Sequence, residues 1–203
     1  MTKGSLARPD NRLYLGRGGS GKTTLALSHA ASFPRVLLSL PDDSEAPPRG
    51  FHIIRDRADL VRALMRPAWR VAWIADRRLD LWEWANEAAW LAGDCLVIWE
   101  EAGVFMEGIR LAPHAYDLWM RGRHRRLRVF ACSQRPARVS RDCTANLARA
   151  VIFNTTEPND LRFYRSMIFE PEAAAAIPRL DFAGHEALDW SPAGWAVKKA
   201  PFA

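Results

Sequence analysis

The sequence predicts an α/β fold of three layers, in which helices cover both faces of a central, mostly parallel sheet. Two observations lead to this fold class. Short apolar segments alternate almost throughout with segments whose apolar residues repeat at helical spacing. In addition, residues 95–99 form an unbroken apolar run, which is typical of a parallel strand buried on both faces. A chain of 203 residues is long enough to form one domain with a sizeable core.

The expected strands and helices follow one another in regular order. We expect strands at residues 13–15, 35–40, 51–54, 70–75, 95–99, 127–134 and 150–154. We expect helices at residues 24–31, 57–65, 79–91, 114–119, 141–147, 159–167 and 170–176. Residues 1–180 should therefore form the core domain. Residues 181–203 should form a short C-terminal extension, whose two apolar stretches and Gly and Pro turns indicate a hairpin packed on the core or on a neighbour.

A glycine-rich loop separates the first expected strand from the first expected helix. It matches the phosphate-binding P-loop pattern (Walker A), G-x-x-x-x-G-K-[ST], at every fixed position. Its glycines let backbone N–H groups turn towards a phosphate, and the helix that follows adds the positive end of its dipole. Lys22 can reach the β- and γ-phosphates, and the hydroxyl of Thr23 can bind Mg²⁺. The expected residues of this site for ATP and Mg²⁺ are Gly16, Arg17, Gly18, Gly19, Ser20, Gly21, Lys22, Thr23 and Thr24.

Polar side chains follow two of the later strands. Glu100 and Glu101 end the buried run, as the acidic residues of a Walker B motif do. We expect Glu100 to hold the metal together with Thr23, and Glu101 to polarise the attacking water. Gln134 ends the next strand, where its amide can bond both the γ-phosphate and that water. Because ligands bind at the carboxyl ends of parallel strands, these side chains and the phosphate loop should meet at one edge of the sheet.

The chain is basic, and its positive charge is unevenly distributed. The net charge is +6, with 25 Arg against four Lys, and residues 121–141 hold eight arginines and no acidic residue. Such a run can line a path for nucleic acid phosphates. One of its arginines can instead act as a finger that reaches the γ-phosphate bound to a neighbouring subunit. We expect one finger, with other arginines lining a DNA path, and the plain alternative is a solvated basic face.

Several other classes of protein are disfavoured by the sequence. The three cysteines include no C-x-x-C pair, which argues against a disulfide scaffold or a zinc site. Residues 1–12 are too polar for a signal peptide, and no uncharged apolar run approaches the roughly 20 residues of a membrane span. We therefore expect a soluble, cytoplasmic protein. The three tryptophans of residues 79–91 fit core packing better than a stacking platform for bases.

Residues 121–160 contain several short motifs in a distinctive order. A basic Gly-Arg-His segment at 122–124 leads into a strand that ends in Ser-Gln-Arg-Pro at 133–136. Then come Val-Ser-Arg-Asp, a short helix, an apolar strand and Glu-Pro-Asn-Asp at 157–160. This order of motifs resembles the FtsK–HerA superfamily of DNA-pumping P-loop ATPases. With the phosphate loop and residues 98–101, the resemblance covers about two thirds of the chain. The chain is similar above all to the genome-packaging ATPases of tailless, membrane-containing viruses, to which the Zot-like assembly ATPases of filamentous phages are related.

The resemblance implies a RecA-like (ASCE) ATPase whose subunits form a ring, often a hexamer, around duplex DNA. Such a protein hydrolyses ATP to drive DNA translocation. We therefore expect a motor that packages a viral double-stranded DNA genome into a preformed capsid. Its further partners would be a capsid vertex or viral membrane proteins, and its place the host cytoplasm or the virion. The family's arginine finger maps onto Arg123, with Arg121 as the alternative.

Two departures from the family pattern matter. Glu100 stands where the family usually has Asp, so the family's metal-binding role carries over to this residue less directly. The sequence also shows neither the transmembrane segment of Zot-like proteins nor the extra domains of cellular FtsK and HerA, which favours a minimal soluble packaging motor.

Four alternatives remain open. The loop nearly matches that of ParA/MinD partition ATPases, but Arg17 stands where they have a signature lysine. A filamentous-phage-type assembly ATPase is the second alternative. A small-molecule kinase, whose lid would use the arginines of 121–128, is the third, and a non-enzymatic, nucleotide-gated DNA-binding protein is the fourth.

Overall fold

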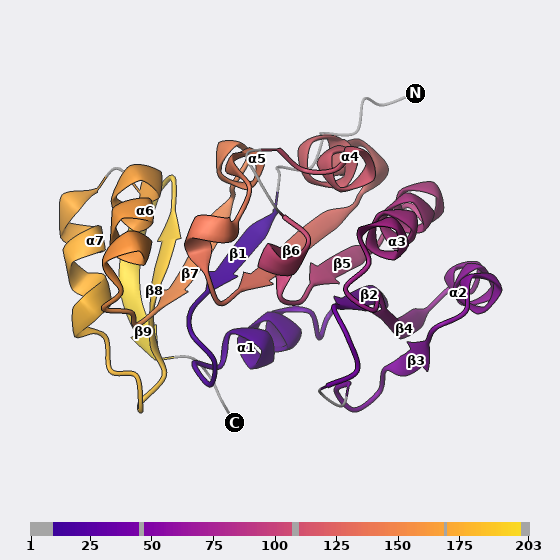
Figure 1. The fold of residues 1–203 in the computed structure, drawn as a ribbon, viewed down its shortest axis with the longest axis horizontal. Coiled ribbons are helices and arrows are strands. Elements are labelled where there is room, and N and C mark those ends of the chain that lie inside the picture. Colours follow the sequence, from indigo (N-terminus) through magenta and orange to yellow (C-terminus); the bar gives the residue numbers. More distant parts are fainter. Residues whose placement is uncertain (1–9, 45–46, 107–109, 169, 200–203) are drawn as a thin grey trace.

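One nine-stranded sheet runs through the molecule, in the order β3-β4-β2-β5-β6-β1-β7-β8-β9 (Figure 1). The computed structural model describes residues 10–44, 47–106, 110–168 and 170–199. The strands are β1 (Arg12–Leu15), β2 (Arg35–Leu40), β3 (His52–Ile54), β4 (Trp69–Ile74), β5 (Leu96–Trp99), β6 (Arg128–Ser133), β7 (Arg149–Phe153), β8 (Glu186–Ser191) and β9 (Gly194–Lys199). Strands β1 to β7 pair in parallel, whereas β8 and β9 are antiparallel.

In the described part of the chain, seven α-helices join these strands. They are α1 (Lys22–His29), α2 (Arg57–Leu64), α3 (Leu79–Ala92), α4 (Pro113–Arg121), α5 (Arg141–Ala145), α6 (Pro158–Ile168) and α7 (Pro171–Ala176). The expected α/β fold class and the expected order of elements are confirmed, with ends that differ by at most two residues. None of the helices in the described part of the chain is both long enough and apolar enough to cross a membrane. The polar N-terminal segment up to residue 9 and residues 200–203 of the expected extension lie outside the described residues.

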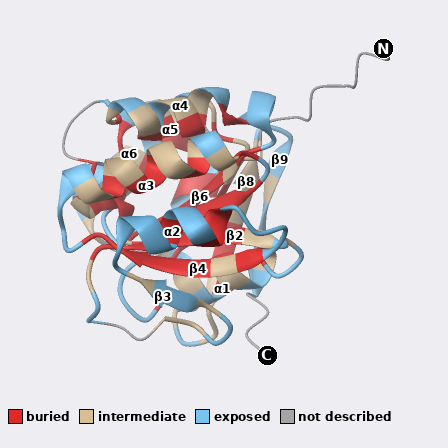
Figure 2. Ribbon diagram, turned by 90° about the vertical axis from the view of Figure 1, so that its right-hand side faces the viewer, coloured by how far each residue is buried: buried red, intermediate tan, exposed pale blue. Residues whose placement is uncertain are grey.

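The helices cover the two faces of the sheet unequally. Side chains of β1 alternate between two cores, because Tyr14 belongs to one cluster and its neighbours Leu13 and Leu15 to the other. Among the helices, α1 alone contributes buried residues to the smaller cluster. Helices α2 to α7 contribute to the larger cluster, so they lie on the opposite face. In Figure 2, the buried residues lie along the strands and on the sides of the helices that face the sheet.

Aromatic packing fixes α3 and α4 on the sheet. Trp82 of α3 lies against Trp99 of β5, with ring centroids 5.2 Å apart, and stacks on Phe105 at 5.1 Å. Trp119 of α4 also stacks on Trp99, with ring centroids 5.9 Å apart. These three indole rings are almost completely buried, and the Nε1 of Trp99 donates a hydrogen bond of 2.9 Å to Asn86. The tryptophan-rich helix therefore packs the core, and its Trp82 is no stacking surface for bases.

The tail of the chain extends the sheet. Strand β8 pairs antiparallel with β7, where Ala187 lies opposite Phe153, and β9 pairs with β8. Asp189 in the middle of β8 accepts hydrogen bonds of 2.5 Å from Arg149 of β7 and from Lys198 of β9. Because β8 is antiparallel to β7, the chain between α7 and β8 returns to the edge at which the parallel strands end.

His29 at the end of α1 gives the fold a pH-dependent element. The hydroxyl of Tyr14 lies 2.8 Å from Nδ1 of His29, which can accept only while the ring is neutral. Burial, together with the charges of Arg12 and Arg149, lowers the pKa of His29 to about 4 from its usual 6.5. The unfolded chain therefore takes up this proton at a higher pH than the folded chain.

We predict that His29 lowers stability as the solution becomes acidic. Its contribution to the free energy of unfolding should be constant above pH 6.5 and should fall between 6.5 and about 4. Chemical denaturation at a series of pH values measures this dependence. The variant His29→Gln keeps a polar partner for Tyr14 without titrating, so its stability should vary less over that range. If the free energy of unfolding fell equally with pH in both proteins, His29 would not be the source of this dependence.

Candidate nucleotide-binding site

The candidate site lies at the edge where the parallel strands end. Strand β6 is the neighbour of both β1 and β5, so the segments that follow these three strands lie side by side. The amide of Gly16 donates a 3.1 Å hydrogen bond to the carbonyl of Ser133, which fixes the start of the loop to the end of β6. The amide of Glu100 donates a 3.0 Å hydrogen bond to Ser39 of β2. The phosphate loop, the two glutamates and Gln134 are therefore brought to one edge, as the sequence indicates.

The backbone of the loop requires its glycines. Gly19 and Gly21 have φ of 74° and 90°, in the left-handed region that side chains disfavour. A Cβ on Gly16 would lie 2.8 Å from Cβ of Phe153 and 2.8 Å from Oγ of Ser20. The loop is thus a tight cradle, closed by a hydrogen bond of 3.2 Å from the amide of Ser20 to the carbonyl of Arg17.

Helix α1 begins inside the motif, two residues earlier than expected. Gly21 in its left-handed conformation precedes Lys22, so the first helical turn carries Lys22, Thr23 and Thr24. Lys22 is only 6% exposed, and the neighbouring Ser20 is buried with an Oγ that has no hydrogen-bond partner among the described residues. A buried cation beside an unpaired hydroxyl is suited to binding an anion between them.

Thr23 and Glu100 are joined directly. The hydroxyl of Thr23 donates a 2.7 Å hydrogen bond to Oε1 of Glu100, whereas Oε2 of Glu100 is buried without a partner in the described part of the chain. Burial raises the pKa of Glu100, and the Thr23 bond and the charge of Lys22 oppose this rise. Hydroxyl and carboxylate oxygens are the ligands that Mg²⁺ prefers, so these two residues fit the expected metal. The described residues offer no group of three or more His, Cys, Asp or Glu for a metal, so phosphate and water oxygens would complete its shell.

Glu101 and Gln134 form the second pair at this edge. Nε2 of Gln134 donates a hydrogen bond to Oε1 of Glu101. Oε1 of Gln134 would lie 3.7 Å from a Cβ on Gly18, so the amide also faces the phosphate loop. Glu101 has φ 49° and ψ 40°, a left-handed conformation that costs about 1–3 kcal/mol and recurs at functional sites. The pair links the end of β5, the end of β6 and the loop.

The arginine run is divided between the two edges of the sheet. Arg121, Arg123 and the residues up to Arg126 precede β6, and Arg135 follows it. The six residues of β6 span roughly 20 Å at about 3.3 Å each, so Arg123 is far from the phosphate loop of its own chain. Arg121 pairs with Asp117 at 3.0 Å, whereas Arg123 lines a small cavity of about 120 Å³. One chain therefore does not bring either finger candidate to its own loop.

Two residues of the extension contact the loop, and neither is among the site residues expected from the sequence. The guanidinium carbon of Arg17 lies 3.7 Å from the ring centroid of Phe182. Nδ1 of His185 lies 3.1 Å from the carbonyl oxygen of Ser20. A single aromatic residue and a single histidine in a tail form no motif. Only the antiparallel direction of β8, which the apolar pattern does not encode, returns them to this edge.

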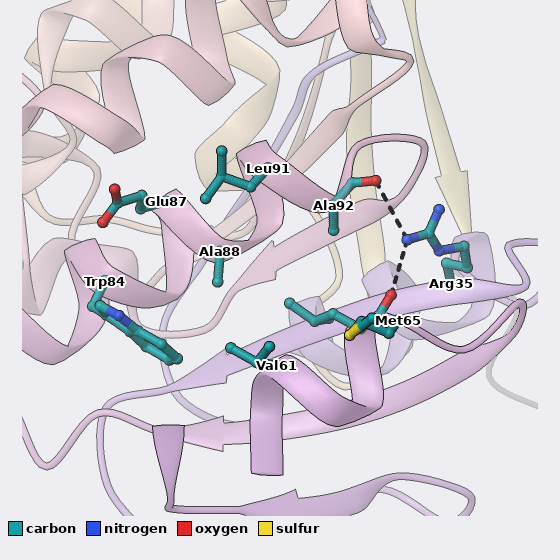
Figure 3. Close-up of a pocket in the computed structure, with 9 residues that line it drawn as sticks. Arg35, Val61, Met65, Trp84, Glu87, Ala88, Leu91 and Ala92 are labelled. Carbon is teal, nitrogen blue, oxygen red and sulfur yellow. Dashed lines mark hydrogen bonds between the residues drawn. The ribbon is translucent and has the colours of Figure 1, made fainter. Parts of the chain in front are cut away.

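A separate hollow of about 570 Å³ lies between α2 and α3 (Figure 3). Val61, Met65 and Leu91 point towards it, and it is mostly apolar. The guanidinium of Arg35 at its rim donates to the backbone carbonyls of Leu64 and Ala92, at 3.2 and 3.5 Å. Arg35 begins β2, so this hollow opens near the edge opposite the phosphate loop and belongs to no part of the candidate site.

We predict that Gly16→Ala destabilises the folded chain. The added Cβ would overlap Phe153 and Ser20, and such overpacking typically costs about 1–3 kcal/mol. Gly18→Ala is the matched control in the same loop, because its Cβ would meet its nearest neighbour at an ordinary 3.7 Å and should change stability by less than about 0.5 kcal/mol. Urea unfolding compares the two. If both variants were equally stable, the tight closure of the loop described here would be wrong.

No protein-family model and no curated protein sequence matches the chain. Its fold is similar to that of the genome packaging NTPase B204 from Sulfolobus turreted icosahedral virus 2 in complex with AMPPCP. The two are 17% identical, with a TM-score of 0.76 over 96% of this chain and 99% of that chain. The N-terminal domain of zonular occludens toxin from Neisseria meningitidis is 14% identical, with a TM-score of 0.52 over 97% and 96%. VirB4 of Thermoanaerobacter pseudethanolicus is 10% identical, with a TM-score of 0.63 over 100% and 92%.

These neighbours are of the kinds that the resemblance in sequence indicates. At sequence identities of 10% to 17%, the likeness to these structures is evidence for the fold alone. The chain therefore has the three-layer P-loop NTPase fold that its sequence predicts, shared with a viral genome packaging NTPase.

Proposed function

We propose that the chain is an ATP hydrolase that drives DNA translocation and packages a viral double-stranded DNA genome into a preformed capsid. One observation carries the enzymatic part of the proposal. The Thr23–Glu100 bond and the Glu101–Gln134 bond lie at the same edge as the phosphate loop, where a hydrolytic site needs a metal ligand, a base and a phosphate sensor.

Each of these side chains has a distinct role in the proposed reaction. Lys22 and the loop amides bind the β- and γ-phosphates, and Thr23 and Glu100 hold Mg²⁺, which when bound neutralises phosphate charge. Glu101 orients the attacking water and accepts its proton. Gln134 bonds to Glu101 and so holds this carboxylate beside the loop, where its amide can also bond the γ-phosphate.

The finger must come from a second copy of the chain. Arg123 lies at the edge opposite the loop of its own chain, so it can act on a γ-phosphate only across an interface. A head-to-tail contact that repeats this pairing forms a ring when its rotation closes, and we propose that it forms a hexamer around duplex DNA. Arg121 is the alternative finger, although its bond to Asp117 would have to break.

Packaging is favoured over the other functions of P-loop proteins by the similarity of the folds. The genome packaging NTPase B204 matches this chain with a TM-score of 0.76, against 0.52 for the zonular occludens toxin domain and 0.63 for VirB4. The likeness to the zonular occludens toxin domain supports a filamentous-phage-type assembly ATPase as the second candidate, with a lower TM-score. A capsid vertex or viral membrane proteins would be further partners, in the host cytoplasm or the virion. A partition ATPase or a kinase would leave the position of the Glu101–Gln134 pair unexplained.

We predict that purified protein hydrolyses ATP and that duplex DNA increases the rate. Glu101→Gln should retain ATP binding but lower turnover about 100-fold or more, because the base is lost while the loop is intact. Lys22→Ala should lose nucleotide affinity itself. Phosphate release in the presence and absence of DNA, together with calorimetric binding, separates these effects. Glu172→Gln, an exposed carboxylate on α7, is the control and should behave like wild type.

Two results would contradict the proposal. If a nucleoside monophosphate rather than DNA raised turnover, the chain would be a kinase. If Glu101→Gln left DNA-stimulated hydrolysis intact, the protein would be a nucleotide-gated binder whose function does not depend on this carboxylate.

A further inference from the structure

The chain between α7 and β8 lies against the phosphate loop. Asp181 to His185 form a turn, held by a 3.2 Å hydrogen bond from the amide of His185 to the carbonyl of Phe182. Glu186 ties the turn to β8, because its carboxylate accepts from the amide of Asp181 and its own amide donates to the carbonyl of Asp181, both at 2.9 Å. The turn is thus a defined structure at the edge where β7 ends.

Contacts along the loop follow a spatial order. Gly18 faces Oε1 of Gln134, a Cβ on Gly19 would lie 3.9 Å from the ring of Phe182, and the carbonyl of Ser20 lies 3.1 Å from His185. The loop therefore has Gln134 on its β6 side and the turn on its β7–β8 side. The aromatic ring on that side is half-buried, and the guanidinium of Arg17 is centred 3.7 Å from it.

A bound nucleoside triphosphate must lie across the loop in one direction. Its terminal phosphate belongs beside the residues proposed for hydrolysis, Glu101 and Gln134, on the β5–β6 side. Its nucleoside end must then leave the loop on the opposite side of β1, where β7 and β8 lie. A base needs a flat apolar or cationic surface to replace water on its face, and an aromatic ring paired with a guanidinium is such a surface.

We propose that the Arg17–Phe182 pair, held against the loop by His185, is the contact surface for the base of the bound nucleotide. This inference rests on the proposed function and adds the residue that recognises the nucleoside part of the substrate. Stacking uses the π-face that every base has, so the surface accepts purine bases without distinguishing adenine from guanine. The C-terminal extension is then part of the substrate site.

A merely structural role predicts a different outcome. If Phe182 only held Arg17 and the loop in shape, its loss would weaken binding of every ligand of the loop. Inorganic tripolyphosphate provides the distinction, because it fills the phosphate positions and has no base.

The test compares ATP, GTP and tripolyphosphate binding, each with Mg²⁺, to wild type and Phe182→Ala by calorimetry. Loss of one stacked base should weaken ATP and GTP binding about 10-fold each and leave tripolyphosphate affinity unchanged. Phe182→Tyr keeps the ring and should retain wild-type affinity for all three. Tyr116→Ala removes an exposed aromatic ring of α4 and should change none of them. Circular dichroism checks that each variant is folded.

Two outcomes would overturn the inference: an equal loss for all three ligands, or no loss for any. Lys22→Ala separates a failure of the inference from a failure of the proposed function. If wild type bound none of the ligands, or if Lys22→Ala bound them as well as wild type, the phosphate site itself would be refuted, and the base surface with it.

Discussion

The hydrogen bond between Thr23 and Glu100 joins two residues that are 77 positions apart in the chain, and the rest of the site depends on it. It can form only if β1 and β5 end at the same edge with β6 between them. Burial of the Glu100 carboxylate is unfavourable, and the Thr23 hydroxyl and the charge of Lys22 compensate it only in part, because Oε2 has no partner among the described residues. A divalent cation would supply the missing interaction. The metal site that we propose therefore has an electrostatic basis in the buried carboxylate of Glu100.

The fold was predictable, and so was the meeting of the loop, the two glutamates and Gln134 at one edge, because their signals are local. The apolar run before Glu100 and the glycine pattern of the loop each specify their own conformation, and parallel strands bring their carboxyl ends together. Contacts that depend on strand order and direction were not predictable. The run of arginines is continuous in sequence, yet β6 carries the chain across the sheet and separates Arg123 from Arg135. Likewise, Phe182 reaches the loop only because β8 reverses direction beside β7.

The two edges of the sheet have complementary chemistry. One carries the phosphate loop and the carboxylates, and the other carries Arg121 to Arg126 at the start of β6. In the ring that we propose, head-to-tail contacts would supply each loop with a neighbour's arginines, and a single chain would not complete its site. This arrangement would make hydrolysis conditional on assembly, which suits a motor whose subunits must act in turn around DNA. The C-terminal turn against the loop would extend the same site to the nucleoside part of the substrate.

The most direct test of this account is the rate of ATP hydrolysis per subunit as a function of protein concentration, with the oligomeric state of each sample measured by sedimentation. The account predicts that the rate per subunit rises with the fraction of assembled protein and is close to zero where the protein is monomeric, because each site lacks its arginine there. A rate per subunit that stays constant down to concentrations at which only monomers sediment would show that one chain holds a complete site, and would contradict the account.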